Sequence, residues 1–183
     1  MRSKIFNTRK MVTIGILVAL HVVLCQIASI RVGNSFSITI SGITEVVAGL
    51  LFGPVSGGVT GLLGSLLNQV LKYGFSVTTI LWILPAALKG LLCGWYAKSN
   101  HYELNPLKIL WVLLVTSVIV TAINTNVMII DAALFNYNTQ AAVLAHLGIR
   151  YANGALTSVL YLIVTAPLLK RLGKMEGISV MQE

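Results

Sequence analysis

Ionisable and hydrogen-bonding side chains interrupt the long apolar stretches of this chain, and their spacing makes them candidates for binding chemistry. Near the C-terminus such groups stand at offsets 0, 3, 4, 7 and 11, which is one face of a helix: Arg150, Asn153, Gly154, Thr157 and Tyr161. Guanidinium, amide, hydroxyl and phenol groups offer hydrogen-bond donors and acceptors to a polar ligand. The pattern predicts one wall of a binding pocket.

Three more segments carry polar faces of the same kind. They are Asn68 with Lys72, Trp82 with Pro85 and Lys89, and Asn124 with Asp131. Pockets for small organic ligands combine apolar walls with a few placed polar groups, and an aromatic plane stacks on a flat ring. We therefore predict that these residues contact a small-molecule substrate.

Five of the polar groups lie at the expected ends of apolar segments and at one level: Arg31, Lys72, Tyr73, Asp131 and Arg150. One interpretation is that they converge around a shared cavity. The other is that the long cations extend to lipid headgroups, with their stems along apolar surface.

Lys89 lies too deep within its segment to extend easily to a headgroup. A ligand contact and an internal salt bridge with Glu45 or Asp131 are both open for it. For Asn124 an interhelical hydrogen bond is an equal alternative. His21 stands alone in the middle of an apolar run, so we interpret it as a packing residue.

The elements that position these groups are membrane spans. Hydrophobic residues make up 56% of the 183 residues and charged residues only 10%, against about 25% in soluble domains. Met11 to Ile30 carries no charge, and twenty residues are enough to cross a hydrocarbon core of about 30 Å. Backbone in lipid must satisfy its own hydrogen bonds, which favours helices for such runs. The net charge of +8 then reflects membrane topology and lipid contact rather than nucleic acid.

We predict an all-α, six-helix membrane bundle that forms a single domain over residues 1–183. The expected helices cover about 12–30, 42–52, 55–71, 79–97, 107–130 and 148–169, with an irregular stretch at 31–41 and a loop at 131–147. An even number of helices puts both termini on one side. That side holds nine cations, Arg2, Lys4, Arg9, Lys10, Lys98, Lys108, Lys170, Arg171 and Lys174, so both termini are predicted to be cytoplasmic.

Small residues recur every four positions, a spacing that lets helices approach closely in lipid. One line contains Gly53, Gly57, Gly61 and Ser65, and another contains Ala86, Gly90 and Gly94. Both lines predict packing inside the bundle. A shorter line, Gly15 and Ala19, fits internal packing and contact with another membrane subunit equally well.

Several motifs are absent from the sequence. There is no G-x-x-x-x-G-K-[ST], no H-E-x-x-H and no G-x-S-x-G, and the two cysteines form no C-x-x-C. We predict no catalytic residue, no metal and no cofactor. Five carboxylates are few for a proton-driven pump, so a binding subunit that depends on partner proteins fits better.

The sequence resembles the S components of energy-coupling factor (ECF) vitamin importers. The resemblance rests on A-G-L-L-F-G-P at Ala48 to Pro54, the glycine-rich stretch after it, L-P-A-A-L-K-G-L at Leu84 to Leu91, and Ala166-Pro167-Leu168-Leu169. It implies a six-helix fold in the bacterial plasma membrane with a vitamin pocket open to the outside. It also implies a complex with a membrane-embedded T component and two cytoplasmic ATPases, with Gly15 and Ala19 in place of the family's A-x-x-x-A contact line.

The resemblance is strongest to the folate-like branch, in which Arg31, Lys72 and Arg150 would form charge-assisted hydrogen bonds with the two carboxylates of folate. The chain departs from that branch at Ser65, where an acidic residue is usual. A smaller heteroaromatic compound, of the hydroxymethylpyrimidine or pyridoxine type, is an equal alternative, with Trp82 and Tyr73 stacking on its ring.

Three other functions compete with this interpretation. A self-sufficient carrier or channel would need a continuous polar path through the bundle. An intramembrane enzyme would use Glu45, Asp131 and His21, which the predicted helices place at different depths. A purely structural subunit would leave the polar faces unexplained.

Overall fold

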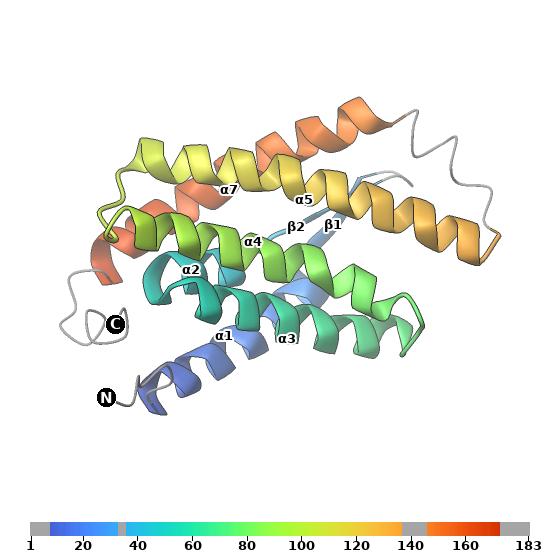
Figure 1. The fold of residues 1–183 in the computed structure, drawn as a ribbon, viewed down its shortest axis with the longest axis horizontal. Helices are drawn as coiled ribbons and strands as arrows, with labels where there is room; N and C mark the ends of the chain where they lie inside the picture. Colours follow the sequence, from blue (N-terminus) through green and yellow to red (C-terminus); the bar gives the residue numbers. More distant parts are fainter. Residues whose placement is uncertain (1–7, 33–35, 137–145, 173–183) are drawn as a thin grey trace.

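The computed structural model describes residues 8–32, 36–136 and 146–172 of the chain (Figure 1). Its elements are α1 (Thr8–Ile27), β1 (Ser29–Val32), β2 (Phe36–Thr39), α2 (Ile43–Phe52), α3 (Pro54–Tyr73), α4 (Thr79–Ser99), α5 (Pro106–Leu134) and α7 (Leu147–Leu172). The predicted bundle of six helices is confirmed within these ranges. The extent of the single domain over 1–183 stays a prediction.

The stretch predicted to be irregular, residues 31–41, is instead largely a β-hairpin. Strands β1 and β2 pair antiparallel, with Ser29 opposite Thr39 and Val32 opposite Phe36. Polar and apolar residues alternate in both strands, which suits a two-sided ribbon. Each strand has only four residues, too few for the alternation to stand out from the apolar runs around it.

Several helix ends also differ from the prediction by three or four residues: α1 starts at Thr8, and α7 ends at Leu172. Helix α1 ends at Ile27, three residues early, because the chain turns there into β1. Helix α5 continues through Asp131 to Leu134, since no glycine or proline interrupts that stretch. The loop expected at 131–147 therefore begins only after Leu134. Residues 137–145 lie outside the described part.

Within the bundle, α2, α3 and α4 pack together, α1 lies against α2 and α3, and α5 pairs with α7 (Figure 1). The start of α1 and the end of α7 lie at the same end of the molecule, and which side of the membrane that end faces stays a prediction. Among the described helices, α1, α4, α5 and α7 are long and apolar enough to span a membrane. Helix α2 has ten residues, all buried, and at 1.5 Å per residue it reaches about half of the hydrocarbon core.

The two long lines of small residues pack against each other, as predicted. Gly57 of α3 meets the backbone of Gly90 of α4, and Gly61 meets the Ala86 carbonyl. A Cβ added at Gly94 would lie 2.5 Å from Cα of Pro54, closer than real Cβ atoms come to other atoms. Helices α2, α3 and α4 therefore touch through backbone atoms, which only glycine permits at these positions.

The substitution Gly94→Ala is expected to destabilise the bundle by about 1–3 kcal/mol, because the new methyl group meets the main chain of Pro54. The matched control is Gly15→Ala, since nothing lies within 4 Å of a Cβ added at Gly15. Thermal unfolding of the purified protein in detergent measures both. Equal melting temperatures for the two variants would contradict the close approach of α3 and α4.

Candidate functional site

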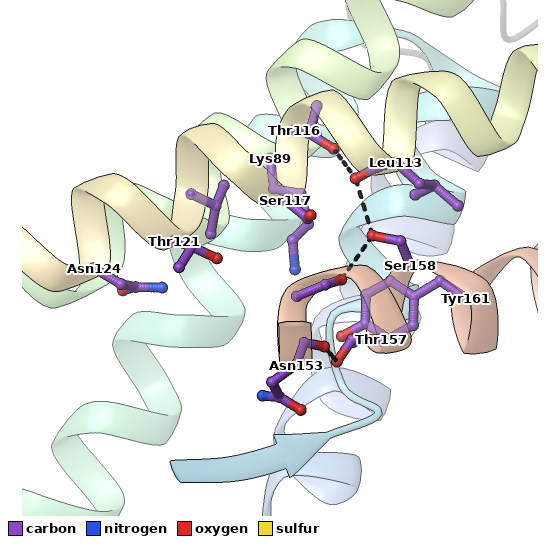
Figure 2. A pocket seen from close by; sticks show the side chains of 12 residues that line it. Lys89, Leu113, Thr116, Ser117, Thr121, Asn124, Asn153, Thr157, Ser158 and Tyr161 are labelled. Carbon is purple, nitrogen blue, oxygen red and sulfur yellow. Dashed lines mark hydrogen bonds between the residues drawn. The ribbon is translucent and has the colours of Figure 1, made fainter. Parts of the chain in front are cut away.

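Two adjoining polar cavities lie inside the helical bundle. The first, here called the α5–α7 cavity, has a volume of about 160 Å³ and is lined by α5, α7 and Lys89 of α4 (Figure 2). The second, here called the central cavity, has about 210 Å³, and every described helix contributes to its wall. Four residues line both cavities: Lys89, Val120, Asn124 and Tyr161. The cavities therefore meet around Lys89 and Asn124.

A buried group of charges forms one side of the central cavity. Lys89 Nζ lies 3.3 Å from Glu45 Oε1, and His21 Nδ1 lies 3.2 Å from Glu45 Oε2. Lys89 Nζ also lies 5.1 Å from the centroid of the Tyr161 ring, within the range of a cation–π interaction. Because an isolated charge is costly in an apolar interior, Glu45 is the group that makes a cation at this depth tolerable.

The Thr44 hydroxyl links His21 to the segment before α2. It donates to the Ser41 carbonyl at 2.8 Å, and His21 Nδ1 lies 2.9 Å from the same hydroxyl oxygen. His21 is buried and contacts Glu45 and Thr44, which agrees with the packing role interpreted from sequence, although the residue does not stand alone. These two partners were not foreseen, since nothing in the sequence pairs α1 with α2.

Lys89 thus takes one of the two partners that the sequence left open. Its salt bridge is with Glu45, and its side chain lines both cavities at the same time. Among the described contacts of His21, the acidic partner is likewise Glu45 and not Asp131. Glu45 and His21 therefore lie at the same depth, and the predicted difference in depth between these two residues is wrong. The depth of Asp131 relative to them stays a prediction.

Five of the predicted substrate contacts line the cavities. Asn68, Trp82 and Asn124 lie in the wall of the central cavity with Lys89, and Asn153 lies in the wall of the α5–α7 cavity. Asn68 Oδ1 also accepts a bond from Gln26 Nε2 at 3.4 Å, which ties α3 to α1. Their role in binding stays a prediction.

Four other predicted contacts are not in the walls of these two cavities: Lys72, Tyr73, Asp131 and Arg150. Lys72 and Tyr73 are exposed at the end of α3, with Lys72 Nζ 5.5 Å from the ring centroid of Tyr73. Arg150 donates to Thr125 Oγ1 at 3.2 Å and to Met128 Sδ at 3.4 Å, so it joins α7 to α5. Asp131 is half-buried in the last turns of α5.

The backbone of Arg31 lies in β1 opposite Ser37, and its side chain is outside the described part of the structure. A contact of Arg31 with the substrate stays a prediction.

Several lining residues were not singled out from the sequence. Ser117 and Thr121 stand on α5 at offsets 0 and 4, and Asn124 follows at offset 7, which is a readable helix face. Glu45 also had a signal, as the single charge between Val32 and Leu71. Ser41 of the central cavity had none, because a lone serine in an apolar stretch is common. Ser65 of the same cavity was noted as part of a line of small residues and as a departure from the folate-like branch, but not as a lining residue.

Gly15 and Ala19 face outward from α1. Both are exposed, and Gly15 has no neighbour within 4 Å of an added Cβ. Exposed apolar residues flank them on the same helix: Met11, Val12, Ile16, Leu20 and Val23. This line of small residues is therefore not used for packing within the described bundle, and a partner contact for it stays a prediction.

Comparisons with known proteins agree on the architecture. A structure described as FolT bound with folic acid superposes with a TM-score of 0.68 at 20% identity, covering 91% of this chain and 97% of that chain. A structure described as the S component of a bacterial ECF transporter gives 0.61 at 17% identity, covering 91% and 96%. At such identities the likeness shows the fold, which is that of a multi-pass S component.

The family follows from the sequence comparison. The model of the family described as ECF-type riboflavin transporter, S component, matches residues 5–174. The chain belongs to this family, which is a class of transporter components rather than of enzymes.

Curated relatives match over a shorter range. A UPF0397 protein of Streptococcus gordonii (strain Challis) is 33% identical over 96 residues, which is 50% of each chain. A UPF0397 protein of Onion yellows phytoplasma (strain OY-M) is 35% identical over 92 residues, or 50% of this chain and 49% of the relative. The chain thus spans about half the length of the curated relatives it matches.

Proposed function

We propose that this protein is the substrate-binding S component of an ATP-driven vitamin importer in a bacterial plasma membrane. The observation that carries the proposal is the pair of polar cavities inside an apolar bundle, which meet at Lys89 and Asn124. Membership of the ECF S-component family supports it. The chain would bind the vitamin itself and would take the energy for transport from its partners.

The substrate we propose is a compact heteroaromatic vitamin or precursor. The two cavities together fall at the lower end of the range of roughly 300–1,000 Å³ that is typical of small-molecule sites. Trp82 in the wall of the central cavity supplies a plane for stacking. Hydroxymethylpyrimidine, pyridoxine and riboflavin, the last from the family description, are the candidates of this kind.

Folate has support of a different kind, from the fold shared with FolT. Two of the cations expected to bind the carboxylates of folate count against it. Lys72 is exposed at the end of α3, and Arg150 is hydrogen-bonded to α5. Lys89 is already paired with Glu45. We therefore rank folate behind the smaller or uncharged candidates.

The partners we propose are a T component and two ATPase subunits. The outward line of Gly15 and Ala19, with apolar side chains around it, supports a helix–helix contact in the membrane. Small residues on such a surface let a partner helix approach closely.

Native mass spectrometry of the purified protein tests the proposed function, followed by titration with the four vitamins in detergent. We expect one bound small molecule and submicromolar affinity for one of the four, read from the quenching of tryptophan fluorescence. A protein that carries no small molecule and binds none of the four would contradict the proposal.

A third cavity, separate from the α5–α7 cavity and the central cavity, favours a self-sufficient carrier as the alternative function. It has a volume of about 520 Å³ and lies at the opposite end of the bundle, with His101, Asn105 and Lys170 in its wall. Ile109 of this cavity and Leu113 of the α5–α7 cavity are one helical turn apart on α5, and both are buried. One turn of α5, about 6 Å along the helix axis, would then separate the third cavity from the α5–α7 cavity. Vitamin flux into liposomes that contain this chain alone, without ATP, would support the carrier, and its absence would support the S component.

A further inference from the structure

Several hydroxyl groups in the wall of the α5–α7 cavity already donate their hydrogens to backbone carbonyls. Thr157 donates to the Asn153 carbonyl at 2.7 Å, and Ser158 donates to the Gly154 carbonyl at 2.9 Å (Figure 2). On the facing helix, Ser117 donates to the Leu114 carbonyl at 3.1 Å. These three side chains line the cavity from two helices that face each other.

A hydroxyl group has one hydrogen and two acceptor lone pairs. If one of these groups donated to a ligand, it would exchange one hydrogen bond for another with little net gain. If it accepts a hydrogen from the ligand, it adds a bond and loses none. The cavity wall formed by Ser117, Thr157 and Ser158 therefore favours ligand groups that donate.

Asn153 strengthens the same preference. Its Oδ1 atom is buried and has no hydrogen-bond partner among the described residues. A buried acceptor left unsatisfied costs about 1–3 kcal/mol, and a donor from the ligand would remove that cost. Thr157 lies one turn from Asn153 on the same face of α7, so one donor-bearing segment could reach both.

The charges nearby do not reverse this preference. Lys89 is the cation in the cavity wall, and Glu45 lies 3.3 Å from it. The positive charge is therefore offset before a ligand enters. An anionic group placed along α5 and α7 would meet the lone pairs of the hydroxyl oxygens at close range.

We infer that the part of the substrate that lies along α5 and α7 carries neutral hydrogen-bond donors, hydroxyl or amino groups, and no carboxylate or phosphate. This inference rests on the proposed function and narrows it. Among heteroaromatic vitamins it selects those with hydroxyalkyl or amino substituents, and it places those substituents against Thr157 and Asn153.

Matched pairs of ligands test the inference with the full-length protein in detergent. The pairs are riboflavin with lumiflavin, pyridoxine with 4-deoxypyridoxine, and hydroxymethylpyrimidine with its analogue that has methyl in place of hydroxymethyl. In each pair the second compound lacks one or more hydroxyl donors that the first carries. In the pair that the protein binds, we expect the hydroxylated compound to bind at least about tenfold more tightly than the other, because the other forms at least one buried hydrogen bond fewer. Equal affinity within that pair would overturn the inference.

Thr157→Val provides the second arm of the test, because it removes the acceptor at nearly constant volume. We expect about three- to tenfold weaker binding of the hydroxylated compound and no change for the deoxy compound. The control is Thr165→Val on the same helix, whose hydroxyl donates to the Tyr161 carbonyl in the same way but lies outside both cavities. Equal effects of Thr157→Val on both compounds would overturn the inference.

The outcomes separate the inference from the proposed function. Folate binding that exceeds that of all three hydroxylated compounds, with an affinity that Thr157→Val leaves unchanged, would preserve the function and overturn the inference, since the bound vitamin would then place no donor against Thr157. Binding of none of these compounds would overturn the function, and the inference with it.

Discussion

Lys89→Met is expected to lower the free energy of unfolding by about 3–5 kcal/mol, because it removes the lysine partner of the buried Glu45 carboxylate. The Glu45 side chain is 2% exposed, with Lys89 Nζ 3.3 Å from Oε1 and His21 Nδ1 3.2 Å from Oε2. A loss of this size corresponds to a fall of roughly 6–20 °C in melting temperature for a chain of this length. Thermal unfolding in detergent measures it.

A double-mutant cycle provides the control for this prediction. Glu45→Gln alone leaves Lys89 without its carboxylate and is expected to destabilise the protein as well. The double variant Glu45→Gln/Lys89→Met removes both charges and is expected to regain most of the lost stability. If the two losses simply added in the double variant, Glu45 and Lys89 would not be acting as a pair.

Asn124→Leu is expected to weaken vitamin binding by about ten- to a hundredfold, because Asn124 carries the amide group that lines both cavities. Its amide offers donors and an acceptor at the junction, and the loss of a buried hydrogen-bonding group costs about 1–3 kcal/mol. Leucine has a similar volume, so the bundle is expected to keep its melting temperature. Titration of the vitamin followed by tryptophan fluorescence measures the affinity.

The matched control for that variant stands two residues further along α5. Asn126 is exposed, and its Nδ2 donates to the Ala122 carbonyl at 2.9 Å. Asn126→Leu is expected to leave the affinity unchanged. A similar loss of affinity in both variants would indicate a general effect on α5 and would contradict the placement of the substrate at the junction.

The helices and much of their packing could be predicted from sequence, because both depend on local patterns. Charge-free runs marked the spans, and glycines at four-residue spacing marked the α3–α4 contact. The β-hairpin at Ser29–Thr39 was missed because each strand is only four residues long and lies between two helices.

The site was predicted less completely, for a geometric reason. The sequence shows which polar residues share a helix face, but not how far along that face a cavity extends. Asn68 and Lys72 share a face of α3, one turn apart, yet Asn68 lines the central cavity and Lys72 is exposed in the last turn. Only the positions of the neighbouring helices decide which of two such residues reaches the cavity.

The contact of α2, α3 and α4 through backbone atoms also limits how the molecule can move. Packed side chains can slide past one another or change rotamer, whereas a carbonyl against a glycine Cα has no alternative arrangement. Gly49 of α2 and Gly57 of α3 both lie against the backbone of Gly90 in α4. These three helices therefore form one stiff body that carries Glu45, Trp82 and Lys89 together. Any rearrangement that releases a bound solute would displace α1 or the α5–α7 pair against this body, and would leave the salt bridge between Glu45 and Lys89 intact.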